Sequence, residues 1–294
     1  MFVLPGSNSS EMRTLVLLTC AWLLSGCTHL FFQPQSKEYL TPEQIGLAYQ
    51  DVYLPGSEGQ KLHAWWLPAQ GKAAGTVLFL HGNAENISTH IASVYWLPAQ
   101  HYNVLLLDYS GYGRSQGAPS VAGAQRDINS AMEILLQRTD IDHQRIVVFG
   151  QSLGGALSIY YVAHSPYRQH IKALIVESSF TSYVDIVREK LDAHWLTWPI
   201  QWPLSLTIDD TYSPLPEVAK VSPIPLLIIH GDKDPVVPLH HGHELFAAAA
   251  QPKDFWLVAG GAHIEAFRHK VYQERLVQYL QQVLTTGAAP AAKP

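Results

Sequence analysis

The chain has 294 residues, of which 47% are hydrophobic and 15% are charged, and its formal net charge at pH 7 is −5. This composition is typical of a globular protein long enough to form one large domain. It argues against nucleic acid as a partner, because binding to phosphates needs clustered lysine and arginine.

The N-terminal segment has the pattern of an export signal. Arg13 precedes an apolar stretch at 15–24, about half as long as a membrane-spanning helix requires. Leu24-Ser25-Gly26-Cys27 resembles the lipobox of bacterial lipoproteins, in which the chain is cut before the cysteine and that cysteine is acylated. The resemblance implies a signal peptide at 1–26 and a lipid anchor on Cys27. An ordinary signal peptide that happens to contain a cysteine is the alternative.

The residues around Cys27 also suggest a location. Residues 1–11 do not resemble the charged start of a signal peptide, so Met12 is an alternative start of the chain. Thr28 follows the cysteine, in place of the aspartate that commonly retains lipoproteins at the inner membrane. We therefore expect the bacterial cell envelope, at the outer membrane facing the periplasm. Residues 27–46 are predicted to be the lipidated cysteine, a tether and a leading segment.

Apolar runs alternate with amphipathic stretches along most of the remaining chain. QDVYLP and KLHAWWLP flank turn residues at 56–59 and predict an antiparallel hairpin. Six further strands are predicted at 76–80, 103–109, 145–149, 172–177, 225–230 and 254–258. Helical patterns lie at 87–97, 120–138, 153–164, 239–249 and 266–284. This alternation predicts an α/β fold, with a mostly parallel eight-stranded sheet and helices on both faces.

One connection is far longer than the usual loop between a helix and a strand. Residues 179–224 contain a helical pattern followed by tryptophan–proline pairs, and we predict a small cap insertion within a domain spanning 47–284. Its tryptophans either contact an apolar acyl or aromatic group or form the core of the cap: Trp195, Trp198 and Trp202. The tail at 285–294 is predicted to be disordered.

The stretch Gly150-Gln151-Ser152-Leu153-Gly154 lies between a predicted strand and a predicted helix. In that context G-x-S-x-G predicts a sharp turn that exposes the serine hydroxyl, with glycines where a Cβ would collide with neighbouring backbone. The following helix start directs backbone N–H groups toward a developing anion. The alternative is a glycine-rich turn in which Ser152 only caps the helix.

A serine nucleophile needs a histidine base and a carboxylate that orients it. Asp234 follows the strand at 225–230, and His263 follows the strand at 254–258. Sites in parallel α/β sheets form at these carboxyl ends of strands. The order Ser152, Asp234, His263 is also the Ser…Asp…His order of α/β-hydrolases.

Five motifs resemble those of the α/β-hydrolase superfamily, in particular single-domain serine hydrolases with a short cap: HGNAEN (81–86), LDYSGYGRSQG (107–117), GQSLGG (150–155), HGDKDPVVP (230–238) and GGAH (260–263). The resemblance spans roughly 48–284. It implies Asp234 as the triad acid and Asp232 as a loop-capping residue. Glu177, at the end of an earlier strand, is the reserve candidate for the acid, but a role as a buried hydrogen-bond partner is favoured.

The same resemblance assigns the groups around the triad. It implies an oxyanion hole formed by the backbone N–H groups of Asn83 and Leu153, with Gly82 allowing close approach of the backbone. It also implies structural roles for His81 and for Arg114, which would hold neighbouring loops.

His240, His241 and His243 suggest a metal site at first sight. Adjacent histidines at a helix start are expected to point in different directions, and the chain has no HExxH spacing and no cysteine ligands. We therefore expect neither a metal nor a cofactor.

Taken together, the motifs predict a monomeric serine hydrolase that cleaves carboxylic esters or thioesters of a small-molecule acyl substrate, as carboxylesterases and lipases do. The acyl group would pass through a covalent intermediate on Ser152. A peptidase or acyltransferase on the same fold is one alternative. A non-catalytic envelope lipoprotein is another, although an idle protein has no chemical reason to keep an intact triad. The natural substrate and its chain length stay open.

Overall fold

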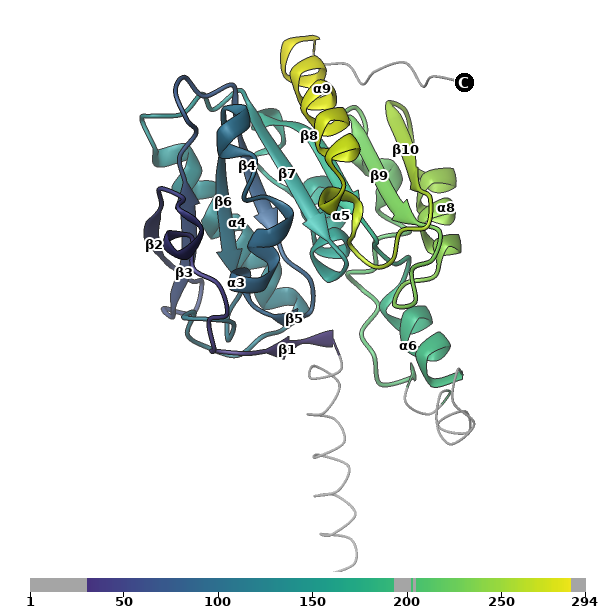
Figure 1. Ribbon diagram of the computed structural model, residues 1–294. Helices are drawn as coiled ribbons and strands as arrows, with labels where there is room; N and C mark the ends of the chain where they lie inside the picture. Colours follow the sequence, from purple (N-terminus) through teal and green to yellow (C-terminus); the bar gives the residue numbers. More distant parts are fainter. Residues whose placement is uncertain (1–30, 193–201, 203–204, 287–294) are drawn as a thin grey trace, which may run out of the picture.

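The protein is described by a computed structural model that covers residues 31–192, 202 and 205–286. Its centre is an eight-stranded sheet with the strand order β10-β9-β8-β7-β4-β6-β3-β2 (Figure 1). Strand β3 pairs antiparallel with β2 and β6, and the other neighbours in this sheet pair parallel. The mostly parallel eight-stranded sheet predicted from the sequence is therefore confirmed.

The strands are β1 (Gln33–Pro34), β2 (Gln50–Pro55), β3 (Lys61–Leu67), β4 (Gly75–Leu80), β5 (Ala84–Glu85), β6 (Tyr102–Asp108), β7 (Ile146–Gln151), β8 (Ile171–Glu177), β9 (Leu226–Gly231) and β10 (Lys253–Val258). The described α-helices are α3 (Ile87–His90), α4 (Val121–Gln137), α5 (Leu153–His164), α6 (Tyr183–Asp192), α8 (Leu239–Ala248) and α9 (Lys270–Thr286). Short 3-10 turns are η1 (Glu43–Ile45), η2 (Ile91–Ser93), η3 (Pro98–Gln100), η4 (Arg168–His170), η6 (Val218–Val221) and η7 (Ala266–Arg268).

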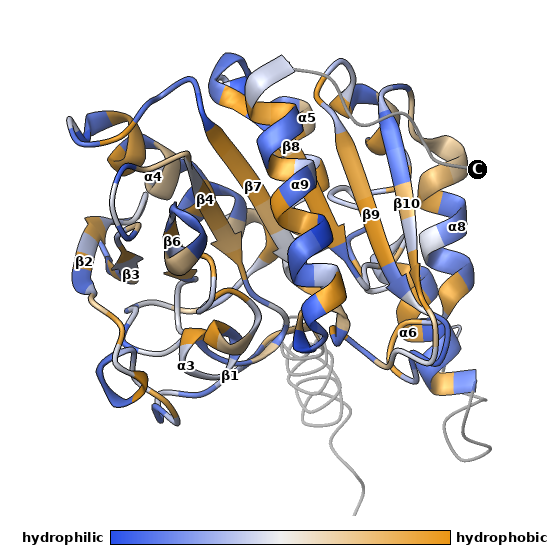
Figure 2. Ribbon diagram, turned by 45° about the horizontal axis from the view of Figure 1, so that its top comes forward, coloured by the Kyte–Doolittle hydropathy of each residue, from blue (hydrophilic) through white to orange (hydrophobic). Residues whose placement is uncertain are grey.

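Both faces of the sheet are covered because alternate residues of each strand point to opposite sides. In β4, Leu78 and Leu80 belong to the apolar cluster that contains buried residues of α4, α5 and α8. Val77 and Phe79 belong to the opposite cluster, which contains residues of α3 and α9. Figure 2 shows the apolar strands of the centre with α9 lying across them. The helices on both faces agree with the prediction.

The helix predicted over 87–97 is wrong in its length. Only Ile87–His90 forms an α-helix, and a 3-10 turn over Ile91–Ser93 follows it. The segment contains several β-branched residues, which lose side-chain freedom in a helix, and buried side chains such as Val94 hold it against the sheet. Tertiary contacts therefore decide its backbone conformation.

The N-terminal part of the domain also differs from the prediction of a tether reaching to residue 46. Phe32 is 1% exposed, and the Gln33 N–H donates to the Asn83 carbonyl at 2.9 Å. The Asn86 side-chain amide donates to the backbone carbonyls of Gln35 and Lys37. Residues 31–46 thus lie on the domain because buried aromatic surface and backbone hydrogen bonds hold them there. The adjacent aromatic residues Phe31 and Phe32 were the sequence feature that could have indicated that this segment packs on the domain.

The cap insertion begins with α6, as its helical pattern predicts, and its two ends meet where the Leu215 N–H donates to the Thr181 carbonyl at 3.0 Å. Trp195 and Trp198 lie outside the described residues. Trp202 is 62% exposed and stacks on Arg188, with the guanidinium 4.4 Å from the ring centre. At the C-terminus, α9 continues to Thr286, and the rest of the predicted tail lies outside the described residues.

Within the described residues, no helix is both long enough and apolar enough to cross a bilayer. The predicted signal peptide and Cys27 lie outside those residues.

Candidate active site

Ser152 occupies the sharp corner between β7 and α5. Its backbone has φ 52° and ψ −117°, a conformation that residues with a Cβ rarely adopt and that occurs at functional corners. Its backbone N–H donates to the Glu177 carbonyl at 2.8 Å, which ties the corner to the end of β8. The Ser152 hydroxyl does not cap α5. The helix-cap alternative for this serine is therefore wrong.

Two glycines make this corner possible. A Cβ on Gly150 would lie 2.2 Å from the backbone oxygen of Gly154, and a Cβ on Gly154 would lie 2.1 Å from the backbone oxygen of Leu80. Both obstacles are backbone atoms of regular elements and cannot move aside. Helix α5 therefore starts close to β4, directly behind Ser152.

Asp234 and His263 come together from the loops after β9 and β10. The Asp234 Oδ2 lies 2.8 Å from His263 Nδ1, and its Oδ1 accepts the backbone N–H groups of Val236 and Val237, each at 2.8 Å. Burial alone would raise the pKa of Asp234, but the hydrogen bond and charge of His263 and these two N–H groups bring that pKa below its usual value. Asp234 is therefore an ionised acceptor for His263.

The neighbouring carboxylate has a different task. Asp232 Oδ1 accepts the backbone N–H of Gly260 at 2.7 Å and so holds the loop that leads to His263. This contact agrees with its expected role as a loop-capping residue.

Ser152 and His263 are both among the described residues, and no hydrogen bond joins the Ser152 hydroxyl to the His263 ring. The loop after β10 is nevertheless held beside the serine corner, because the Ile264 N–H donates to Ser178 Oγ at 3.3 Å and the Ala266 N–H to Glu177 Oε1 at 2.9 Å. In substrate-free enzymes such catalytic hydrogen bonds are often long and shorten when substrate binds.

Glu177, the reserve candidate for the acid, contacts other groups. Its Oε2 accepts the Gln151 side-chain amide at 2.6 Å, and its Oε1 accepts the Ala266 N–H. Burial raises the pKa of Glu177 to about 7, against the opposing effect of these two hydrogen bonds. Glu177 therefore joins the serine corner to the histidine loop and does not orient His263. This agrees with the favoured prediction of a buried hydrogen-bond partner, although the sequence did not reveal the two partners, because tertiary contacts set them.

The two predicted oxyanion donors lie next to Ser152. Leu153 is the first residue of α5, where backbone N–H groups have no partner within the helix. Asn83 lines the same pocket as Ser152 and Leu153, and its carbonyl is held by the Gln33 N–H and by the Tyr112 hydroxyl at 2.6 Å. These contacts fix Asn83 through its carbonyl. The Asn83 N–H, which belongs to the preceding peptide unit, has no partner among the described residues.

The pocket beside Ser152 has a volume of about 160 Å³ and is largely apolar. Phe180, Ile186 and Val187 form much of its cap side, and Phe31 of the N-terminal segment also contributes. Among the described residues that line it, Lys190 is the only charged one. The pocket therefore suits an apolar group, and sequence reasoning missed the contribution of Phe31.

Two further residues lie where the resemblance implied structural roles. His81 is fully buried, burial holds its pKa well below the usual value, and its Nδ1 lies 2.7 Å from the Gly82 carbonyl. Arg114 donates to Glu38 at 2.8 Å and to Asp51 at 3.2 Å, and so joins its own loop to the N-terminal segment and to strand β2.

Fold and site together define the class of protein. The family model described as serine aminopeptidase, S33 (Hydrolase_4) matches residues 71–212. The alpha/beta hydrolase domain-containing protein WAV2 of Arabidopsis thaliana is 34% identical over 262 residues, covering 84% of this chain and 83% of that protein. The chain belongs to the α/β-hydrolase superfamily. Its membership of this superfamily identifies it as a hydrolase.

Bacterial relatives match over a longer range. The uncharacterized protein YfhR of Escherichia coli O157:H7 is 36% identical over 277 residues, covering 92% of this chain and 93% of that protein.

Among solved structures, the Pyrococcus furiosus esterase Pf2001 is 21% identical, with a TM-score of 0.67 over 86% of this chain and 96% of that one. A puromycin-hydrolyzing peptidase of Mycobacterium tuberculosis is 20% identical, with a TM-score of 0.64 over 83% of this chain and 41% of that one. At these identities the likeness shows the α/β-hydrolase fold.

Proposed function

We propose that the chain is a serine hydrolase that cleaves carboxylic esters or thioesters through an acyl-enzyme on Ser152. The observation that carries the proposal is the hydrogen bond between Asp234 and His263, in loops fixed beside a strained serine corner. An apolar pocket of about 160 Å³ with Ser152 in its wall supports an acyl group as the part of the substrate that binds there.

In this mechanism Ser152 Oγ attacks the substrate carbonyl while His263 takes the hydroxyl proton. Asp234 accepts the Nδ1–H of His263, which fixes the tautomer and stabilises the imidazolium. The backbone N–H groups of Asn83 and Leu153 bind the oxyanion of the tetrahedral intermediate. His263 returns the proton to the departing alcohol or thiol. Water, activated by the same histidine, then releases the carboxylic acid and restores Ser152.

One observation favours esters over the substrates of an aminopeptidase. An aminopeptidase must bind the free ammonium group of its substrate, which calls for a carboxylate near the nucleophile. Lys190 is the only charged residue among the described residues that line the pocket, and it is a cation. A cation beside an apolar pocket repels an ammonium group and tolerates a neutral acyl chain.

We also propose that Cys27 carries the lipid anchor and that the enzyme works at the envelope membrane. Phe31, which lines the pocket, is only four residues from Cys27 in the sequence. Four extended residues reach at most about 14 Å, so an acylated Cys27 would keep the pocket close to the bilayer surface. Esters presented at that surface are then the substrates within reach.

Fluorophosphonate labelling and a panel of p-nitrophenyl esters test the chemistry. We expect covalent labelling of the wild-type chain and none of Ser152→Ala, together with faster hydrolysis of esters than of matched amides. Equal labelling of the two proteins would contradict the proposal.

The anchor needs a separate test. Cys27→Ala should abolish palmitate labelling and either release the domain from the membrane fraction or leave uncleaved precursor. An unlipidated wild-type protein would contradict the anchor and leave the triad proposal standing.

A further inference from the structure

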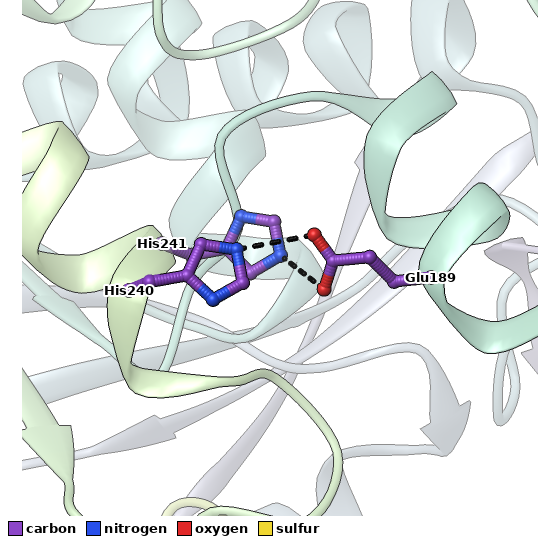
Figure 3. Close-up of side chains that lie close together, drawn as sticks. All are labelled: Glu189, His240 and His241. Atoms are coloured by element: carbon purple, nitrogen blue, oxygen red, sulfur yellow. Dashed lines mark hydrogen bonds and ion pairs between the residues drawn. The ribbon is translucent and has the colours of Figure 1, made fainter. Parts of the chain in front are cut away.

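A cluster of three ligand-type side chains joins the cap to the core, away from the triad. Glu189 projects from α6, and His240 and His241 project from the start of α8 (Figure 3). The His240 Nε2 lies 3.1 Å from Glu189 Oε1, and the His241 Nε2 lies 3.3 Å from Glu189 Oε2. The two imidazole rings stack at 4.3 Å with 30° between their planes. The expectation that adjacent histidines point apart was therefore wrong.

The donor set is one that binds zinc. Two imidazoles and one carboxylate bind Zn²⁺ at about 2.0–2.2 Å and leave a fourth position for water. Two ligands of a tetrahedral ion at these distances lie roughly 3.3–3.4 Å apart. The two contacts of the cluster use different oxygens of Glu189 and measure 3.1 and 3.3 Å, and one ligand atom from each of the three residues lies within 4.8 Å of the others. Because the side chains of Glu189 and His240 are partly exposed, they have room to rotate toward a common centre.

A second observation supports a site prepared for an ion. His241 is 1% exposed, and its Nδ1 lies 2.8 Å from the Thr181 hydroxyl and accepts the Thr181 backbone N–H at 3.3 Å. These contacts fix the imidazole ring of His241 with its Nε2 toward Glu189. The side chains of Glu189 and His240 are 36% and 49% exposed, so an ion can reach the cluster from solvent.

We propose that Glu189, His240 and His241 bind a Zn²⁺ ion that fastens the cap helix α6 to the core helix α8. Helix α6 also supplies Ile186 and Val187 to the pocket wall. A bound ion would hold that wall in place without touching the triad.

The test uses the purified, untagged chain, because a histidine tag would itself bind zinc. After equilibrium dialysis against micromolar Zn²⁺ and then zinc-free buffer, mass spectrometry should find one zinc ion per chain. Glu189→Gln and His240→Ala should each weaken binding by at least about tenfold. His243→Ala is the matched control, because that ring lies on the same helix but stacks on Phe255 at 4.9 Å. It should retain full zinc binding.

Two measurements independent of activity decide whether the ion lies in this cluster. X-ray absorption should show nitrogen and oxygen ligands at about 2.0–2.2 Å. Added Zn²⁺ should raise the melting temperature of the wild type and of His243→Ala, but not of Glu189→Gln, because ligands stabilise the state that they bind. Absence of stoichiometric zinc in the wild type would overturn the proposal. So would zinc binding that is equal in the wild type, Glu189→Gln and His240→Ala.

Discussion

The two sides of the pocket beside Ser152 are held by different kinds of contact. On the sheet side, Ser152 and Leu153 follow a buried strand, and backbone clearances at Gly150 and Gly154 set their position. On the cap side, α6 is joined to the core through side chains: Lys190 Nζ donates to the Pro235 carbonyl at 3.1 Å, and Glu189 contacts His240 and His241.

This difference separates the residues proposed for catalysis from the residues that would select the substrate. Backbone atoms inside a sheet cannot shift without breaking the ladder, so the reacting groups keep one geometry. Surface side-chain contacts contribute little individually, so without a bound ion the position of the cap wall depends mainly on a few buried apolar residues such as Ile186 and Val187. Substitutions of the proposed reacting groups on the sheet side should therefore abolish turnover, and substitutions in the cap wall should mainly change which substrates bind.

The largest effect is expected for Ser152→Ala. Without the nucleophile no acyl-enzyme forms, and kcat/KM for an activated ester should fall on the order of 10⁵-fold. Initial-rate measurements check this, with circular dichroism to show an intact fold. A loss below tenfold would place the nucleophile elsewhere and remove the basis of the comparison.

The two aspartates of the loop after β9 should differ strongly. Asp234→Asn leaves His263 without its ionised acceptor and should lower kcat by about 10³–10⁴-fold. Asp232→Asn loses only a loop contact to Gly260, so kcat should stay within a few fold of the wild type. Comparison of kcat for the two variants checks the assignment. A larger loss for Asp232→Asn would reverse it.

Glu177 should affect stability in a pH-dependent manner. Its pKa is about 7 in the folded protein, above the ordinary 4.5, so between these pH values the folded chain holds more protons than the unfolded chain. The contribution of this carboxyl to stability therefore decreases as pH rises from about 4.5 to 7, by up to about 3 kcal/mol. Urea unfolding across this range should show that decrease in the wild type but not in Glu177→Gln.

The exposed Glu274 provides the control for that experiment. Glu274→Gln should follow the wild-type pH dependence. If wild type and Glu177→Gln differ in unfolding free energy by the same amount at every pH, the raised pKa is wrong.

The smallest effect is expected on the cap wall. Ile186→Ala removes apolar surface from the pocket and should raise KM several fold for an octanoate ester, while KM for an acetate ester changes less than twofold. Trp202→Ala is the control, because this side chain is 62% exposed and stacks on Arg188 outside the pocket. Equal changes in KM for both esters in Ile186→Ala would show that the cap does not select chain length.

Much of the sheet side could be predicted from the sequence because its signals are local. Apolar runs between helical stretches indicated the strands, and the glycines around Ser152 indicated a turn that only small residues permit. The carboxyl ends of parallel strands share one edge of the sheet, which was enough to group Ser152, Asp234 and His263 in one region. Their catalytic roles stay a prediction.

Only the tertiary structure decided the features that depend on distant contacts. Glu189 and His241 are 52 positions apart, and the partners of Glu177 lie on β7 and beyond β10. Phe31 reaches the pocket because its segment runs beside β5. Local sequence patterns report how a segment buries its own apolar face, not which distant side chains meet it, since that depends on packing of the whole chain.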